Sequence, residues 1–304
     1  MNGFNLSDIT DAKFGNVQVS ELYFGSTKIW PLNHDYSQDY FTFEALESGN
    51  FTFTGNSIYY SIDDGSTWTQ LASGSSTPTL NGNDKILFKA TGLSVNSGIG
   101  QFSSSGQFNV MGNIMSLIYG DNFINQTTIN ANQFVNLLKG NSYLRNAQNL
   151  ILPATTLAYK CYYCMFYNCT SLTTAPELPA TTLANYCYGY MFQNCTSLTT
   201  APELPATTLP NGCYYSMFSG CSSLTTAPAL PATSLANYCY QRMFSGCSSL
   251  NYVKCLATDM SATGCLTDWL QNVSSTGTFV KDVNTTWPSG VSGIPSGWII
   301  QNAS

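Results

Sequence analysis

Cysteine is the residue type whose spacing in this chain most directly suggests chemistry. The 304 residues include eleven cysteines, and most of them fall into two series whose members are 26 residues apart. One series is Cys161, Cys187, Cys213, Cys239 and Cys265, and the other is Cys169, Cys195, Cys221 and Cys247. Thiols at fixed repeat positions predict two buried ladders, in which each cysteine packs as a small apolar residue and its S–H meets a backbone carbonyl. Disulfide bonds between the two ladders are the alternative.

Metal binding is not expected from these thiols. A zinc site needs four ligands that converge on one point, whereas the repeats contain no histidine and space their cysteines along a line. Cys164 and Cys255 lie outside both ladders. We therefore predict neither a metal nor a cofactor.

The other groups that could act in catalysis are isolated in the sequence. His34 is the only histidine, and it lies in an expected linker with no evident partner to orient it as a base. Glu177 and Glu203 occupy equivalent repeat positions, so they are expected to form a row rather than a pair flanking one sugar bond. The sequence thus predicts a protein that is not an enzyme.

Residues 61–68, SIDDGSTW, fit the pattern S-x-D-x-G-x-T-W and resemble the Asp box that recurs in sialidases. The functional interpretation would be a glycosidase. The structural interpretation is a hairpin in which Asp63 accepts hydrogen bonds from backbone amides and Trp68 packs underneath. One copy of the box and only two arginines, Arg145 and Arg242, favour the structural interpretation.

An internal repeat organises the second half of the chain. Four gapless copies of 26 residues fill 151–176, 177–202, 203–228 and 229–254, with a decayed copy at 255–280 and an upstream one around 137–144. In the second copy, Leu183, Cys187, Tyr188, Met191 and Phe192 fall on one helical stripe, and 197–201 favours a short strand. Repeats of this kind bury their apolar side chains by stacking. The expected core ladders are the two cysteine series together with Met165, Phe166, Met191, Phe192, Met217, Phe218, Met243 and Phe244.

The expected fold is therefore mixed α/β, with an amino-terminal all-β region followed by a leucine-rich-repeat-like solenoid with degenerate caps. Short aromatic runs separated by Gly, Ser and Asn predict a small β domain, a sandwich or barrel, over 34–120. The full division is an amino-terminal docking hairpin at 1–33, the β domain at 34–120, a cap repeat at 121–150, four repeats at 151–254, and a degenerate repeat with a carboxy-terminal cap at 255–304.

Composition excludes several classes of partner. Charged residues make up only 9% of the chain and the net charge is -6, with no basic run that could neutralise phosphates, so nucleic-acid binding is not expected. No segment approaches the roughly 18 to 20 apolar residues of a membrane span. The start, Met1 to Phe14, shows no basic stretch followed by an apolar one, which predicts that a secretory signal is absent.

Two resemblances suggest a function. The string MF-x-x-C-[TS]-S-L, with a proline after it, resembles the BspA-like leucine-rich repeats of bacterial surface proteins over about 137–280, and this resemblance implies adhesion without catalysis. The segment 17–31 alternates, turns at Gly25-Ser26 and ends in Ile29-Trp30-Pro31. It resembles the amino-terminal docking segment of phage virion proteins, which implies that Tyr23, Phe24, Ile29 and Trp30 contact the particle.

We therefore expect a phage virion structural protein, tail- or head-associated, that docks on other virion proteins and adheres to a host surface glycan or protein. It would be assembled in the host cytoplasm, and phage fibres are commonly trimers, although no heptad pattern demands one here. The alternatives are a BspA-like adhesin of the bacterial cell surface and a non-adhesive decoration protein. Positions that vary between copies are the expected binding surface, and they are Tyr163, Tyr190, Tyr215 and Arg242, with the Glu177 and Glu203 row.

Overall fold

The computed structural model describes residues 35–90 and 98–303, together with the backbone of four short strands between residues 13 and 30. The chain divides into two compact units, Met1–Tyr36 and Ser37–Ser304. His34 and the side chains of Tyr23, Phe24, Ile29 and Trp30 lie outside the described residues.

The first unit contains two antiparallel strand pairs. β1 (Lys13–Phe14) pairs with β2 (Val17–Gln18), and β3 (Leu22–Phe24) pairs with β4 (Thr27–Trp30). The second pair aligns Tyr23 with Lys28 and Phe24 with Thr27, which confirms the strand pairing predicted around Gly25-Ser26.

The second unit begins with a phenylalanine-rich β region. Its strands are β5 (Phe41–Ala45), β6 (Phe51–Gly55), β7 (Ile58–Ser61), β8 (Thr69–Leu71), β9 (Lys85–Lys89), β10 (Gly100–Ser104) and β11 (Phe108–Asn113). Phe43 lies at the centre of its core, with its ring centroid 4.7 to 5.1 Å from the rings of Phe41, Phe51, Phe88, Phe102 and Phe108. In β6 the side chains alternate, with Phe51 and Phe53 buried in this core and Thr52 and Thr54 on the other face, as the period of a strand requires.

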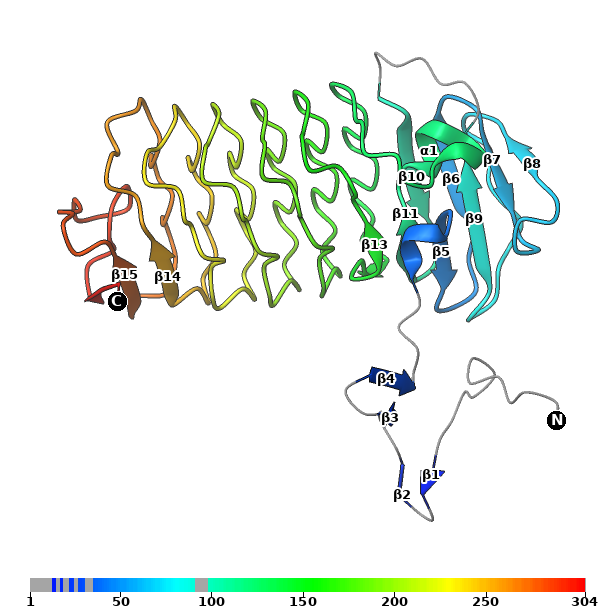
Figure 1. Cartoon of the computed structure of the whole chain (residues 1–304), viewed down its shortest axis with the longest axis horizontal. Coiled ribbons are helices and arrows are strands. Elements are labelled where there is room, and N and C mark those ends of the chain that lie inside the picture. Colours follow the sequence, from blue (N-terminus) through cyan, green and yellow to red (C-terminus); the bar gives the residue numbers. More distant parts are fainter. Residues whose placement is uncertain are drawn as a thin grey trace. The chain divides into compact units, whose positions relative to one another are not determined.

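The β region continues directly into the repeats. β12 (Leu144–Asn146) and β13 (Leu150–Ile151) both pair in parallel with β11, in a seven-stranded sheet of order β12-β11-β5-β9-β7-β8 with β13 also on β11. At the other end, β14 (Tyr252–Cys255), β15 (Gly277–Lys281) and β16 (Trp298–Asn302) form a parallel sheet. Figure 1 shows the intervening coils lying side by side between these two groups of strands.

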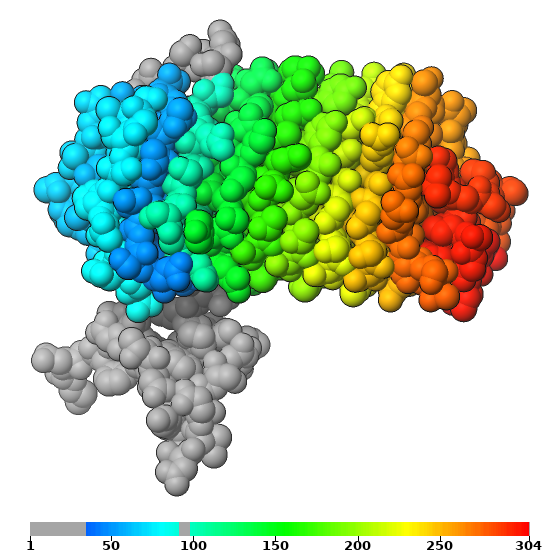
Figure 2. All heavy atoms as spheres, turned by 180° about the vertical axis from the view of Figure 1, so that it is seen from behind, coloured from blue at the N-terminus to red at the C-terminus, as the bar shows by residue number. Residues whose placement is uncertain are grey.

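The prediction of a mixed α/β solenoid is wrong. The structure is mostly β, its sheets do not build a solenoid, and the one α-helix among the described residues is the single turn α1 (Ser116–Tyr119), followed by a 3₁₀ turn at Gly120–Asn122. The predicted helical segments of the repeats are runs of turns, and residues 152–251 contain no strand longer than an isolated bridge. What the repeats form is a stack of turn-rich coils, visible as adjacent bands in Figure 2.

A left-handed residue at every fourth position is what prevents a helix. In the first copy, Lys160, Cys164 and Asn168 have φ of 52°, 57° and 61°, and the equivalent residues of the later copies share this conformation. An L-residue in an α-helix has a negative φ, so each of these positions interrupts helical geometry. We call the segment 160–169 and its equivalents at 186–195, 212–221, 238–247 and 264–273 the turn ribbon.

Backbone hydrogen bonds along the turn ribbon alternate between two destinations. Tyr162, Cys164 and Phe166 donate to carbonyls of the next coil, those of Cys187, Gly189 and Met191, over 2.9 to 3.0 Å. The residues between them donate three positions back along the same coil, as Met165 does to Tyr162. Each ribbon is therefore tied to its neighbours by main-chain bonds at every second residue.

Residues of the turn ribbon face inward and outward in pairs. Cys161, Tyr162, Met165, Phe166 and Cys169 are all fully buried. In the interior, equivalent rings stack: the Phe166, Phe192, Phe218 and Phe244 rings lie 5.3 to 5.7 Å apart with planes within 6° of parallel. A second stack runs Tyr162, Tyr188, Tyr214, Tyr240 at 5.8 to 6.1 Å. The predicted core ladders of Cys, Met and Phe are confirmed as buried.

Proline explains why the middle coils lack strands. Pro176, Pro202 and Pro228 occupy the repeat position that is Lys254 in β14 and Val280 in β15. Proline has no N–H to donate to a ladder, so pairing fails where it stands. Where lysine and valine replace it, β14 and β15 align Lys254 with Val280 in a parallel ladder.

Ser216 offers a test of the turn ribbon against a helix. It is buried and has φ 51°. Because glycine adopts this conformation without strain, we expect Ser216→Gly to be more stable than Ser216→Ala by about 1 kcal/mol. A helix would give the reverse order by a similar amount. The unfolding free energies of both variants in urea decide between them, and alanine proving the more stable would contradict the turn ribbon.

Candidate functional site

Three of the four predicted surface residues of the turn ribbon come together. The rings of Tyr163 and Tyr190 are 5.3 Å apart and edge to face, and those of Tyr190 and Tyr215 are 5.1 Å apart. They belong to three consecutive coils and occupy outward positions of the ribbon. Tyr186 joins them, with its ring 6.3 Å from that of Tyr215.

Glycines in the next coil make room for these rings. A Cβ added at Gly189 would lie 2.9 Å from ring atoms of Tyr163, and one added at Gly212 would collide with the ring of Tyr186. Both rings therefore lie against the main chain of the neighbouring coil. The same relation holds between Tyr238 and Gly264.

A lysine lies among the rings. The Lys160 ammonium is 5.2, 4.9 and 5.8 Å from the ring centroids of Tyr159, Tyr163 and Tyr186. Such cation–π contacts hold an ammonium next to aromatic faces. Sequence reasoning missed Lys160, Tyr159 and Tyr186. We call the set Tyr159, Lys160, Tyr163, Tyr186, Tyr190 and Tyr215 the tyrosine surface.

The hydroxyls of Tyr163 and Tyr190 stay protonated at physiological pH, because the pKa of each is raised. Partial burial is the main cause that raises the pKa of Tyr163 to about 12, and the nearby Cys164 and other tyrosines add to the effect. The pKa of Tyr190 is also raised, by partial burial first and then by its hydrogen bond with Tyr215. The surface therefore offers aromatic ring faces, tyrosine hydroxyls and the ammonium of Lys160.

Arg242, the fourth predicted ribbon residue, belongs elsewhere. It lies one coil beyond Tyr215, and its Nε is 3.5 Å from Oδ2 of Asp268 in an exposed ion pair. Exposed pairs of this kind contribute little to stability. The structure does not bring Arg242 into the tyrosine surface.

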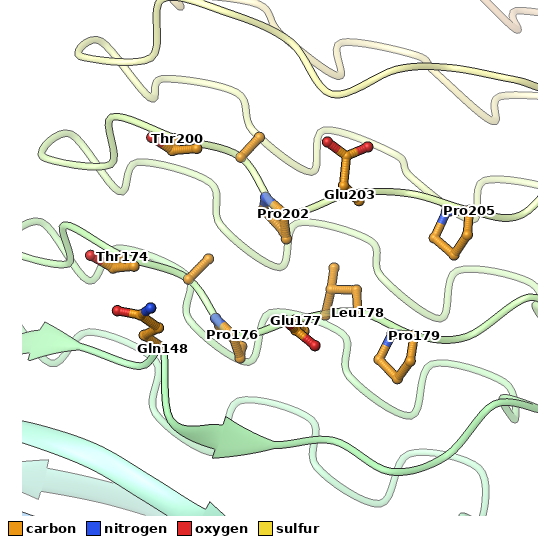
Figure 3. A pocket seen from close by; sticks show the side chains of 12 residues that line it. Gln148, Thr174, Pro176, Glu177, Leu178, Pro179, Thr200, Pro202, Glu203 and Pro205 are labelled. Carbon is orange, nitrogen blue, oxygen red and sulfur yellow. The ribbon is translucent and has the colours of Figure 1, made fainter. Parts of the chain in front are cut away.

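Glu177 and Glu203 line a separate groove of about 390 Å³. As Figure 3 shows, they alternate with prolines in two neighbouring coils: Pro176 and Pro179 in one, Pro202 and Pro205 in the next. Both glutamates are exposed. The predicted row of carboxylates is present, but its apolar proline walls were not foreseen, because they depend on how the coils lie beside one another.

The Asp box is a structural hairpin. Asp63 Oδ1 accepts hydrogen bonds from the Thr67 N–H at 2.9 Å and the Ser61 hydroxyl at 2.7 Å, and Oδ2 accepts one from the Thr67 hydroxyl. These bonds lower the pKa of Asp63 to about 2, and the bond from the Thr67 side chain has the largest effect. The predicted hydrogen bonding of Asp63 is confirmed for the Thr67 amide.

Trp68 takes part in a polar cluster that sequence reasoning did not find. The Lys89 ammonium lies 4.1 Å from the Trp68 ring and 2.6 Å from Oδ1 of Asp121, which also accepts a 2.7 Å bond from the Tyr40 hydroxyl. The pKa of Asp121 is lowered, mainly by its contact with the Lys89 ammonium. The pKa of Tyr40 is raised to about 12, mainly by partial burial. The cluster fastens the Asp-box hairpin to the turn after α1.

All eleven thiols are free and buried. In the second ladder, Sγ of Cys169, Cys195, Cys221 and Cys247 each donates to a carbonyl in the preceding coil over 3.0 to 3.1 Å. The predicted bond of the S–H to a carbonyl is therefore confirmed for this ladder, and the disulfide alternative is not what the structure shows. Among the described residues, no group of three or more His, Cys, Asp or Glu is placed to hold a metal ion.

Comparisons with known proteins add no identity. No family model, no curated protein and no solved structure matches the chain. Within the described part, no helix has the length and apolar character needed to cross a membrane.

The raised pKa values of the buried thiols predict that the folded chain is less stable at alkaline pH. Burial raises the pKa of Cys169, Cys187, Cys247 and Cys255 to about 12, against about 8.5 for a free thiol. Between these values the unfolded chain has lost protons that the folded chain keeps, so the unfolding free energy falls as pH rises. We expect a lower Tm at about pH 10 than at about pH 7. Equal Tm values, or native-state thiols that react with a thiol reagent as fast as unfolded ones, would contradict this.

Proposed function

We propose that the chain is a phage virion structural protein that adheres to the host cell surface through its stacked coils. The observation that carries the proposal is the tyrosine surface, because tyrosines on rigid backbone bind with little loss of conformational entropy. The resemblance of the repeats to BspA-like adhesins and of segment 17–31 to virion docking segments supports the same function. No catalysis is part of the proposal.

The state of the cysteines favours a virion over the second candidate, a bacterial cell-surface adhesin. Eleven free thiols suit a protein that folds in a reducing compartment, and a phage particle is assembled in the host cytoplasm. An adhesin exported to an oxidising surface would have to keep all of these thiols unpaired. A non-adhesive decoration protein is the third candidate, and it makes no use of the tyrosine surface.

Immunogold imaging of a lysate with antibodies against residues 151–254 tests the location. We expect gold on phage particles. Gold on cell envelopes and none on particles would point instead to the adhesin.

Binding of the purified full chain to host cells tests adhesion. Tyr190→Ser and Tyr215→Gln introduce the residues found at the equivalent positions of neighbouring coils, Ser216 and Gln241, so both should fold. We expect the double variant to bind at least about tenfold more weakly, since two anchors are lost. Glu177→Gln is the matched control and should bind like the parent chain. Unchanged binding by a folded double variant would exclude the tyrosine surface.

A further inference from the structure

We propose that the tyrosine surface binds an acidic polysaccharide, with sugar rings stacked on the tyrosines and sugar carboxylates paired with Lys160 and Lys139. This inference rests on the proposed function and names the ligand class of the same site. It follows from three features of the described residues: how the rings lie, which charges surround them, and where the opposite charges are.

The rings form a continuous aromatic row in which neighbouring rings are tilted by 51° to 75°. Tyr163 and Tyr186 lie against the main chain at Gly189 and Gly212, so one side of each ring is supported by backbone. Tyr159 is 44% exposed, and Tyr163, Tyr186, Tyr190 and Tyr215 are half-buried. These two supported rings belong to two consecutive coils, and Tyr190 and Tyr215 lie beside them, so the row of aromatic surface continues into a third coil. A chain of linked sugar rings, each with an apolar C–H side, fits such a row better than a single compact ligand does.

The charges of this surface are positive. Lys160 lies among the rings, and the Lys139 ammonium, from the preceding coil, is 5.3 Å from the ring of Tyr167. Burial raises the pKa of Cys164, next to Tyr163, and the charges of Lys139 and Lys160 both oppose this, so both lysines act at this surface. The turn ribbons of these three coils, at 160–169, 186–195 and 212–221, contain no carboxylate, and neither does the residue before each of them. Among the described residues, neither lysine forms an ion pair, so each ammonium is held by aromatic rings without its charge being neutralised.

The chain as a whole carries the opposite sign. Its net charge is -6, and Glu177 and Glu203 lie in the proline-lined groove, on another part of each coil. A polyanion would therefore be repelled by the molecule in general and attracted only where the lysines lie. Charge complementarity thus favours a carboxylate-bearing polysaccharide over a neutral glycan at the tyrosine surface.

Affinity electrophoresis of the full chain tests the proposal. Native gels would contain polygalacturonate, alginate or heparin as acidic probes, and hydroxyethylcellulose as the neutral probe. We expect at least one acidic polymer to retard the chain, the neutral polymer to have little effect, and retardation to disappear at about 1 M NaCl. Because the chain is acidic, retardation by a polyanion cannot come from its net charge.

Matched variants locate the binding. Lys160→Asn introduces the residue at the equivalent left-handed position upstream, Asn132 with φ 59°. We expect this variant and the Tyr190→Ser/Tyr215→Gln double variant to lose at least about tenfold in affinity. Lys254→Gln removes a lysine of β14, and Glu177→Gln/Glu203→Gln alters the groove; both should be retarded like the parent chain. Circular dichroism and Tm confirm that each variant folds.

Three results would overturn the inference: no retardation by any acidic polymer, equal retardation by the neutral one, or retardation that the folded tyrosine and lysine variants keep. If the chain still binds host cells through the tyrosine surface in these cases, the proposed function stands and only the ligand class is wrong. If cell binding is also absent, both proposals fail.

Discussion

The left-handed backbone at every fourth ribbon residue is the constraint on which the rest of the repeat structure depends. It turns the chain so that alternate N–H groups point along the stack, where they bond to the next coil, and the others close turns within their own coil. Because every second amide is satisfied by a neighbour, one coil alone would leave those donors without partners. The coils are therefore stable only as a stack, as in other repeat proteins. At one end of the stack, the Phe102 N–H of β10 donates to the Leu137 carbonyl. At the other end, the N–H groups of Leu270 and Asp268 donate to the Val291 carbonyl and the Ser292 hydroxyl.

The same constraint separates core from surface. Pairs of ribbon residues alternate between inward and outward, so Tyr162 and Phe166 stack inside while Tyr163 and Lys160 remain outside. Positions outside the inward-facing pairs can change from copy to copy without disturbing the stacked rings and thiols of the interior, whether they are buried, as Cys164 and Ser216 are, or exposed, as Arg242 is. The position of Cys164 is occupied in later coils by Tyr190, Ser216 and Arg242, all left-handed. This freedom allows aromatic residues to collect on three coils and an ion pair on the next.

The sequence predicted the 26-residue phase and the buried side chains, because identical residues at identical spacing must stack on one another. The same sequence pattern led to the wrong prediction of a helix in each repeat. Leu183, Cys187, Met191 and Cys195 are spaced by four residues without drift, whereas an α-helix repeats every 3.6 and would rotate the last of them away from the first. Three consecutive steps of four, with Asn or Gly at the last left-handed position, are the signal that separates a turn ribbon from a helix.

Part of the tyrosine surface could be predicted from the sequence. Variable positions identified Tyr163, Tyr190 and Tyr215, but not Lys160 or Tyr186, whose roles depend on contacts between coils. A cue was nevertheless present. Tyr163, Tyr186 and Tyr238 are each followed in the next coil by a glycine on which the ring lies: Gly189, Gly212 and Gly264. In all three pairs the glycine stands 26 residues after the tyrosine, at the equivalent repeat position. Gly212 and Gly264 are also left-handed. An alignment of the copies that marks each large residue followed by a glycine one period later would identify these pairs.

The groove has no such cue in the sequence. Its walls are prolines of two adjacent coils, among them Pro176 and Pro202, which cannot donate to a strand ladder, so the walls depend on how the two coils lie beside one another.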